Sequence, residues 1–453
     1  MKFKTINPAT EEVIKEYDIM TKDGVENKVK NARKAFETWK GIDIKERSKL
    51  IKKLGKRIER KKQKIAEAIT IEMGKAIKES IPEVEKCARI CEYFGKNAKK
   101  FLKDEKIKTE FQESYVMFEP LGVVGSIMPW NFPMSQAFRF AVPAIIAGNV
   151  QIIKPSSTTP YSGGLVVEEL FKACKFPEHV FSAVIGDATT GTALIESDIN
   201  AASLTGSVET GSKIAQLATK DIKKVVLELG GSDPFIVLND AEIEKTATVA
   251  AAGRFLNCGQ SCIAAKRFIV IKEIAEQFTQ RFIEVTRNMK VGDPMDPNTD
   301  IGPLVRESQR QLVERQIKMS VEQGAKILLG GKRIERKGYF FEPTIMSATN
   351  SMTICKEEAF GPAAPVIIAQ DEEEAIRIAN DTEYGLGASI WTENREKGKM
   401  LTKRIQAGVV FVNKTPRSDP RLPFGGIKKS GMGRELDRYG LLEMVNIKSV
   451  IIN

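Results

Sequence analysis

Apolar residues recur at three- and four-residue intervals through the first hundred positions of the chain. In the segment "KERSKLIKKLGKRIERKKQK", residues 45–64, Leu50, Leu54 and Ile58 follow this spacing, and Ile65 continues it just beyond. Lys and Arg occupy most of the positions between them. An apolar stripe with a charged opposite face is typical of an amphipathic helix. We therefore expect residues 25–105 to be mainly helical.

A different pattern begins with the alternating stretch "ESYVMFEP", residues 113–120, which predicts a strand. From residue 122, short apolar runs alternate with segments of helical spacing. The predicted strands cover 122–129, 150–156, 180–186, 201–206 and 223–231, and the predicted helices cover 133–148, 160–174, 189–197 and 209–218. This alternation indicates right-handed βαβ units and a parallel sheet, in an α/β fold. Such a sheet binds its ligands beyond the carboxyl ends of its strands.

A second region of mixed strand and helix patterns follows the apolar run at 233–240 and continues to about residue 430. The tail "LLEMVNIKSVIIN", residues 441–453, alternates and ends in β-branched residues, which predicts a terminal strand. Such a strand needs a sheet to join, in its own subunit or in a neighbouring one.

The composition is that of an ordinary globular protein of two or three domains. The 453 residues include 70 Lys and Arg and 59 Asp and Glu, a formal net charge of +11. Because the basic residues are mixed with Glu throughout, they indicate a solvated surface rather than a nucleic-acid partner. Six cysteines are too few for a disulfide scaffold, and no apolar run has the length of a membrane span or a signal peptide. We expect a cytoplasmic protein with reduced thiols.

The segment "GRFLNCGQSC", residues 253–262, places Cys258 and Cys262 four positions apart. Cys87 and Cys91 have the same spacing, but this is not the spacing of zinc ligands, and we expect no metal. Nothing in the sequence supports a redox disulfide. Two interpretations remain for Cys262, a buried core cysteine and a nucleophile. Cys258 is either a small residue of the core, which has no chemical role, or an oxidative partner that forms a disulfide with Cys262.

A nucleophilic cysteine needs a group that takes its proton. His179, the single histidine, lies in the loop-like "FPEHV" and fits a surface position better than a catalytic one. Glu228, in "LELGG", ends an apolar strand before two glycines, where partial burial would raise its pKa and suit a general base. Gly259 and Gln260 predict a tight backbone leading into a helix at Cys262, whose N–H groups would lower the thiol pKa and could stabilise an oxyanion.

Five motifs together resemble the aldehyde dehydrogenase superfamily. They are "PWNFP" at 129–133, "LELGG" at 227–231, "FLNCGQSC" at 255–262, "EEAFGP" at 357–362 and "PFGGIKKSG" at 423–431. The similarity extends from "NPATEEVI" near the start to "SGMGRELDRYGL" near the end. Within the family, "ELGGSDPFIVL" and "SDPRLPFGGIKKSGMGRE" are most similar to prokaryotic succinate-semialdehyde dehydrogenases.

The resemblance implies a role for each matching residue. Cys262 matches the nucleophile, Glu228 the general base and Asn131 the oxyanion amide, paired with the Cys262 backbone N–H. Lys154 matches the lysine that bonds the cofactor ribose. The resemblance also implies a cofactor site, made of Met128, Pro129, Trp130, Lys154, Pro155, Ser156, Ser157, Gly191, Gly206, Ser207, Val208, Leu229, Glu358 and Phe360. In "LTGSVETG", the strand, turn and helix start independently favour pyrophosphate binding by backbone N–H groups.

The implied reaction oxidises an aldehyde to an acid through a thioester on Cys262, which Glu228 would hydrolyse. Many NAD-preferring relatives carry Glu at position 157, where it would repel a 2′-phosphate, so Ser157 favours NADP, with NAD possible. Arg139 matches a substrate-carboxylate arginine, which favours succinate semialdehyde, although a structural pairing with Glu or a carbonyl is equally open. A second such arginine is replaced by Leu256, while Arg254 need not point inward. The alternatives are lactaldehyde, glyceraldehyde, a broad aliphatic range, or a thioester hydrolase without hydride transfer.

The resemblance also implies three parts in the chain. A Rossmann-like NAD(P)-binding domain would comprise 1–100 and 121–228, and an α/β catalytic domain would comprise 229–432. A small β oligomerisation element would combine 101–120 with 433–453. Its last strand would complete a neighbouring subunit's sheet, so we expect a homodimer or homotetramer.

Overall fold

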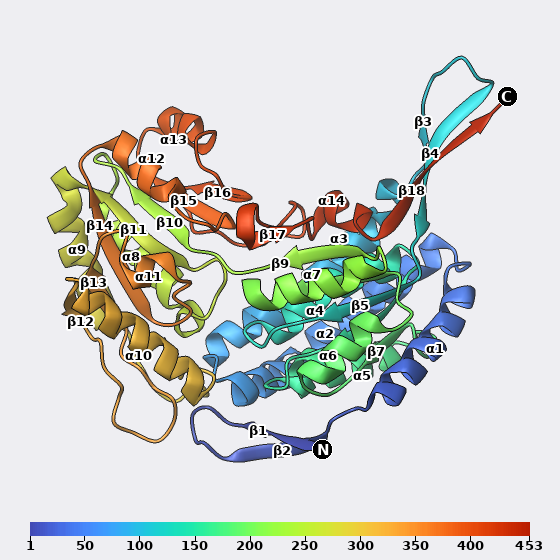
Figure 1. The fold of residues 1–453 in the computed structure, drawn as a ribbon, viewed down its shortest axis with the longest axis horizontal. Coiled ribbons are helices and arrows are strands. Elements are labelled where there is room, and N and C mark those ends of the chain that lie inside the picture. Colours follow the sequence, from blue (N-terminus) through green and yellow to red (C-terminus); the bar gives the residue numbers. More distant parts are fainter.

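A computed structural model describes all residues 1–453 of the chain. Two lobes lie side by side, and a narrow arm that carries the C-terminus projects from one of them (Figure 1). Each lobe is built around its own sheet and has its own hydrophobic core. The α/β fold expected from the alternating pattern is confirmed.

The first lobe contains a six-stranded sheet in the order β17-β9-β8-β5-β6-β7. Its strands are β5 (Val123–Ile127), β6 (Val150–Lys154), β7 (Phe181–Ala183), β8 (Ala201–Thr205), β9 (Lys224–Glu228) and the antiparallel β17 (Gly431–Met432). All the other neighbouring pairs are parallel, as predicted. The register brings Ile127 beside Lys154 and Thr205 beside Glu228, so four predicted strands end at one edge.

Helices surround this sheet. The connecting helices are α4 (Pro133–Ile146), a π-helical turn at Tyr161–Leu165 followed by α5 (Val166–Ala173), α6 (Ala188–Glu196) and α7 (Val208–Lys220). The amino-terminal helices are α1 (Lys22–Trp39), α2 (Ile44–Met73) and α3 (Ile77–Phe101), which confirm the helical pattern of residues 25–105. On α2, Leu54, Ile58 and Ile65 are buried and Leu50 is partly buried, as the spacing predicts. An antiparallel hairpin, β1 (Lys2–Ile6) with β2 (Val13–Asp18), precedes them and has no counterpart in the sequence predictions.

The second lobe contains a seven-stranded sheet in the order β12-β13-β14-β11-β10-β15-β16. Only the β12–β13 pair is antiparallel. The strands are β10 (Asp233–Val237), β11 (Ala265–Ile271), β12 (Lys326–Leu329), β13 (Thr344–Ser347), β14 (Ala363–Ala369), β15 (Gly387–Trp391) and β16 (Val409–Val412). The helices are α8 (Ile243–Phe255), α9 (Lys272–Arg287), α10 (Glu307–Glu322), α11 (Thr353–Lys356), α12 (Glu372–Asn380) and α13 (Arg395–Thr402).

The arm is a three-stranded antiparallel sheet in the order β18-β4-β3. It joins β18 (Val445–Ile452) to β4 (Glu113–Pro120) and β3 (Glu105–Lys106), so the predicted terminal strand pairs within its own chain. The other edge of β18 has no partner in this chain. Before the arm, β17, a 3-10 turn at Lys428–Ser430 and α14 (Asp437–Leu442) return to the first lobe, whose core includes Phe424 and Leu436. The expected boundary at residue 432 therefore falls within a segment that packs on the first core.

No helix combines the length and apolar character needed to span a bilayer. The chain also brings together no cluster of His, Cys, Asp and Glu side chains that could hold a metal ion. The pairs Cys87–Cys91 and Cys258–Cys262 are four separate free thiols, with Cys174 and Cys355 also free.

Candidate active site

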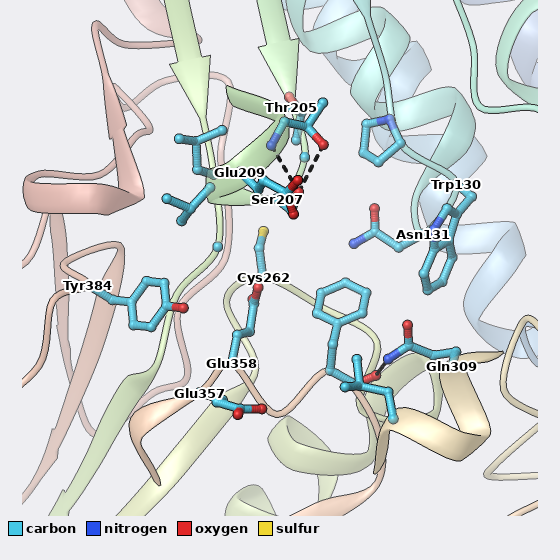
Figure 2. A pocket seen from close by; sticks show the side chains of 18 of the residues that line it. Trp130, Asn131, Thr205, Ser207, Glu209, Cys262, Gln309, Glu357, Glu358 and Tyr384 are labelled. Carbon is cyan, nitrogen blue, oxygen red and sulfur yellow. Dashed lines mark hydrogen bonds between the residues drawn. The ribbon is translucent and has the colours of Figure 1, made fainter. Parts of the chain in front are cut away.

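A cleft of about 530 Å³ lies where the two lobes face each other (Figure 2). The first lobe contributes segments that follow β5, β8 and β9, and the second contributes the Cys262 turn, α10 and the loop before β14. Of the predicted site residues, ten line this cleft: Pro129, Trp130, Asn131, Gly206, Ser207, Val208, Leu229, Cys262, Glu358 and Phe360. Ligands were predicted at the carboxyl ends of the parallel strands, and this is where the first lobe faces the cleft.

Cys262 lies in a turn between a 3-10 segment, Leu256–Gly259, and the start of β11. The predicted helix at this position is wrong. The backbone is left-handed at Asn257 (φ 53°), Cys258 (φ 54°) and Gly259 (φ 72°), and this reverses the chain into a strand. Cys258 is therefore not on a helical face with Cys262 but is buried in the core of the second lobe. Cys262 is the one cysteine that is not fully buried.

Glu228, the last residue of β9, lies beside this thiol. The Cys262 Sγ donates to Glu228 Oε2 at 3.8 Å. Glu228 is 1% exposed, and burial raises the pKa of its carboxyl to about 8, against the opposing charge of Arg139. Burial, followed by the charge of Glu228, raises the pKa of the Cys262 thiol well above its ordinary value. The expected lowering of the thiol pKa is therefore wrong, because the sulfur is buried and the Glu228 carboxyl lies beside it.

Arg139 lies on α4 and is buried in an ion pair rather than exposed to the cleft. Its Nε donates to Glu435 Oε2 at 2.6 Å, and its Nη2 lies 3.6 Å from Glu228 Oε2. The guanidinium also lies over the Phe424 ring, 4.6 Å from its centroid. Of the two interpretations open from the sequence, the structure shows the pairing with Glu. Arg139 thereby places a positive charge beside the proposed base.

Asn131 projects into the cleft from the segment between β5 and α4. Figure 2 shows its side chain directed toward Cys262. Its Nδ2 donates to the Gln260 carbonyl at 3.2 Å, whereas its Oδ1 is buried with no hydrogen-bond partner. The amide is therefore fixed on one side and close to the segment that carries the nucleophile.

Lys154, Pro155, Ser156, Ser157, Met128 and Gly191 lie outside the lining of the cleft, at the carboxyl end of β6 and around it. The Met128 N–H donates to the Lys154 carbonyl at 3.0 Å, and a Cβ at Gly191 would lie 3.9 Å from Lys154 Cδ. Burial lowers the pKa of the Lys154 amine to about 8, while Asp187 opposes this shift. Lys154, predicted to bind the cofactor ribose, thus lies close to other residues of the predicted cofactor site.

Glu358 spans the floor of the cleft. Its Oε1 accepts the Gly231 N–H at 3.1 Å and lies 3.2 Å from Lys266 Nζ, which also donates to the Cys262 carbonyl at 2.6 Å. Phe360 meets Trp130 edge to face, with ring centroids 5.5 Å apart. The loop that carries both predicted residues is therefore attached to the nucleophile turn and to the opposite lobe.

Several residues of the site were missed by sequence reasoning. Lys266 and Glu435 each make two polar contacts with predicted residues, and no local sequence pattern signals them. Gln309 donates to the Phe360 carbonyl at 2.8 Å, and α10 also contributes Leu312 and Gln316 to the cleft. His179 is partly buried in a turn and does not line the cleft, as its loop-like context predicted.

The residues at the strand ends fit a nicotinamide dinucleotide. Thr205 Oγ1 is buried without a hydrogen-bond partner at the end of β8. Ser207 caps α7 by accepting the Thr210 N–H at 3.3 Å, and the first turn of α7 lines the cleft, where a helix N-terminus favours an anion. Together with the Lys154 amine at the end of β6, on the same edge of the sheet with β5 between the two strands, these donors suit a pyrophosphate and a ribose.

Comparison with known proteins gives a consistent result. The sequence model of the Aldehyde dehydrogenase family matches residues 1–450. A protein of Synechocystis sp. named probable succinate-semialdehyde dehydrogenase (NADP(+)) is 42% identical over 455 residues, covering 100% of both chains. The succinate semialdehyde dehydrogenase (NAD(P)+) Sad of Escherichia coli is 40% identical, covering 98% of this chain and 97% of that one. The structure of a succinic semialdehyde dehydrogenase from Streptococcus pyogenes, in complex with NADP+, superimposes with a TM-score of 0.97 at 35% identity, covering 99% of each chain.

Proposed function

Because the chain belongs to the aldehyde dehydrogenase family and is an NAD(P)+-dependent oxidoreductase, we propose that it oxidises succinate semialdehyde to succinate and prefers NADP+. The observation that carries the reaction type is the placement of the Cys262 thiol 3.8 Å from the Glu228 carboxylate, beside the Asn131 amide. The names of the relatives support the choice of substrate.

In the first step, Cys262 attacks the aldehyde carbon. It reacts as the thiolate, so the thiol loses its proton to solvent before the attack. The carbonyl oxygen becomes negative and is held by the Asn131 Nδ2 and the Cys262 backbone N–H, as preorganised donors hold an oxyanion. A bound nicotinamide supplies the hydride acceptor that takes this adduct to a thioester.

In the second step, Glu228 takes a proton from a water that attacks the thioester. The carboxyl suits this role because its raised pKa, about 8, lies near the working pH. Arg139 keeps the negative form of Glu228 accessible in a buried site, where an unpaired carboxylate is costly. The sulfur leaves as the thiolate and takes this proton back from Glu228, which restores the Cys262 thiol.

The cofactor preference rests on Ser157. A short neutral side chain follows Lys154 and Ser156 at the end of β6, so no carboxylate stands where a 2′-phosphate would lie. The substrate preference rests on the relatives, because Arg139 is occupied by Glu435 and Glu228 in this chain. Lactaldehyde, glyceraldehyde and simple aliphatic aldehydes are the competing substrates.

An aldehyde panel with both nicotinamide cofactors tests the proposal. Succinic semialdehyde, lactaldehyde, glyceraldehyde, propanal, hexanal and benzaldehyde are compared by kcat/KM from the absorbance of the reduced cofactor. We expect the highest value for succinic semialdehyde with NADP+. A preference of more than about tenfold for NAD+, equivalent to ~1.4 kcal/mol, would refute the cofactor assignment. A better rate with an uncharged aldehyde would refute the substrate.

We also propose that the protein is a cytoplasmic homo-oligomer. The free edge of β18 and its exposed Ile447, Ile451 and Ile452 support assembly through the arm, because an apolar edge strand favours pairing. The free thiols are in keeping with a reducing compartment. Light scattering should give a dimer or tetramer for the full chain, and a monomeric mass would contradict the assembly.

A further inference from the structure

The turn before Cys262 has left-handed backbone angles, which residues with a side chain rarely adopt. Asn257 (φ 53°, ψ 39°) and Cys258 (φ 54°, ψ 34°) are consecutive left-handed residues that carry side chains. Such conformations persist only where surrounding contacts hold them, and they concentrate at functional sites. The contacts of this turn therefore show what keeps the nucleophile in place.

One contact comes from α3 in the other lobe. Glu79 Oε2 accepts the backbone N–H of Asn257 at 2.9 Å, across 178 positions of sequence. Glu79 forms no ion pair of its own, because the neighbouring Lys75 pairs with Glu83 and Lys78 pairs with Asp300. The Glu79 carboxylate is thus free to accept the hydrogen bond from Asn257, the first left-handed residue of the turn.

The side chain of Asn257 links this turn to the segments that carry the reacting groups. Its Nδ2 donates to the Asn131 carbonyl at 2.9 Å and to the Gln260 carbonyl at 3.2 Å, and Gln260 in turn accepts from Asn131 Nδ2 at 3.2 Å. A single side chain thereby connects the oxyanion segment to the residues directly before Cys262.

The same helix also holds the oxyanion segment. One turn beyond Glu79, on the same face of α3, Glu83 Oε1 accepts the N–H groups of Met134 at 3.1 Å and Ser135 at 3.0 Å, directly after the Asn131 segment. Two carboxylates of one helix therefore contact the two segments that must align for the attack on a carbonyl.

We propose that Glu79 is a positioning residue, which acts through Asn257 to hold the Cys262 turn in alignment with the Asn131 amide. It touches neither substrate nor cofactor in this role, and the inference rests on the proposed function for the reaction that it supports. Its loss leaves a backbone N–H without an acceptor beside a disfavoured turn. The loss should therefore impair the attack rather than the binding of the dinucleotide.

The test compares Glu79→Ala, Glu79→Gln and Glu79→Asp in the full-length enzyme. Glu79→Ala should lower kcat at least about tenfold and change the KM for NADP+ less than about twofold. Glu79→Gln keeps an oxygen that can accept the Asn257 N–H, so it should retain kcat within about threefold. If Glu79→Ala does not fold, Glu79→Asp takes its place, because the shorter side chain weakens the contact and should be slower than Glu79→Gln.

A matched control is Asp240→Ala. Asp240 is a half-buried carboxylate that accepts the backbone N–H of the distant Asn394 at 3.1 Å, away from the cleft. We expect kcat within about twofold of the wild type. The proposal is overturned if Glu79→Ala keeps kcat within twofold of the wild type, or if Glu79→Gln is as slow as Glu79→Ala.

A double-mutant cycle with Asn131→Ala identifies the route of the effect. If Glu79 acts by aligning the Asn131 amide, Glu79→Ala should cost less than about twofold once that amide is absent. A full tenfold loss in the Asn131→Ala background would overturn the proposed route. The two hypotheses fail separately: a wild type that oxidises no aldehyde refutes the proposed function, whereas an active wild type with an unaffected Glu79→Ala refutes only this inference.

Discussion

The dinucleotide end and the nucleophile end of the cleft are built by different rules. At the dinucleotide end, β8 leads through a short turn into the regular helix α7, and the contacts are short-range, as where Ser207 caps its own helix. At the nucleophile end, Cys262 lies in an irregular turn, and its neighbours come from distant sequence, as in the pair Arg139–Glu435. The labelled residues of Figure 2 come from both ends.

Both ends bury a polar atom without a hydrogen-bond partner, which at the dinucleotide end is Thr205 Oγ1, but they differ in how many charged side chains they bury together. Around the nucleophile, Glu228 Oε1 and Asn131 Oδ1 are buried without hydrogen-bond partners, and three charges of Arg139, Glu228 and Glu435 lie together in the interior. Buried polar atoms without partners destabilise the folded chain. The buried charges at the nucleophile end therefore lower the stability of the folded chain while they serve the reaction. The dinucleotide end follows the ordinary geometry of a βαβ sheet.

Replacing Cys262 should separate the two ends most completely. Cys262→Ala removes the nucleophile but leaves β6, β8 and α7 unchanged, so kcat should fall about 10⁴-fold or more, since a lost nucleophile removes the covalent route. The Kd for NADP+, measured by titration, should stay within about threefold. Residual turnover above one hundredth of the wild type would show that another group attacks the aldehyde.

The next largest effect is expected at the base. Glu228→Gln keeps the shape of the side chain but cannot accept a proton, so steady-state turnover should fall about 10²-fold, the contribution of a general base. A rapid-quench burst of reduced cofactor should remain, because the thioester still forms. Absence of the burst would show that Glu228 is required before the thioester, as the acceptor of the thiol proton.

The pH dependence follows from the same carboxyl. Burial raises the pKa of Glu228 to about 8, so the group is protonated and inactive as a base below that pH and becomes competent above it. The kcat of the wild type should therefore rise with pH through about 8, and Glu228→Gln should lose this rise. A wild-type profile that is flat between pH 6 and 9 (roughly one unit or more on each side of the pKa) would contradict the assignment.

The dinucleotide end was largely predictable from the sequence. The apolar runs ending at Lys154, Thr205 and Glu228 are confirmed as parallel strands, because period and turn residues are local properties of the chain. Gly206 and Ser207 follow directly from that pattern, and they line the cleft. The hairpin β1–β2 was missed because both strands are mostly exposed and lack an apolar face.

The nucleophile end was predictable in its residues but not in its geometry. The motif around Cys262 identified the thiol, yet the helix expected after Gly259 is absent, since two left-handed residues with side chains are stabilised only by tertiary contacts. The partner of Arg139 could not be read either, because Glu435 is 296 positions away. The pKa of the Cys262 thiol is raised by its burial and by the nearby Glu228, and the order of residues along the chain predicts neither.

A charge placed at the dinucleotide end should alter cofactor choice and leave the nucleophile end intact. Ser157→Glu introduces a carboxylate near the expected 2′-phosphate, and like charges repel. The ratio of kcat/KM for NADP+ to that for NAD+ should fall at least about tenfold, or ~1.4 kcal/mol. Activity with NAD+ should stay within about threefold, and Ser157→Ala is the matched control. An unchanged ratio would show that residue 157 does not face the adenosine ribose.

The smallest effect is expected at Thr205, on the regular strand end. Its Oγ1 is buried with no partner, whereas Val has nearly the same shape without the hydroxyl. Because an unpaired buried hydroxyl is unfavourable and Val suits a strand, Thr205→Val should raise the free energy of unfolding by up to about 1 kcal/mol. Urea unfolding of the cofactor-free enzyme measures this, and the KM for NADP+ should rise less than about threefold. A stability loss of about 1 kcal/mol or more would mean that the hydroxyl has a hydrogen-bond partner, so that the dinucleotide end, unlike the nucleophile end, leaves no buried polar atom of this kind unpaired.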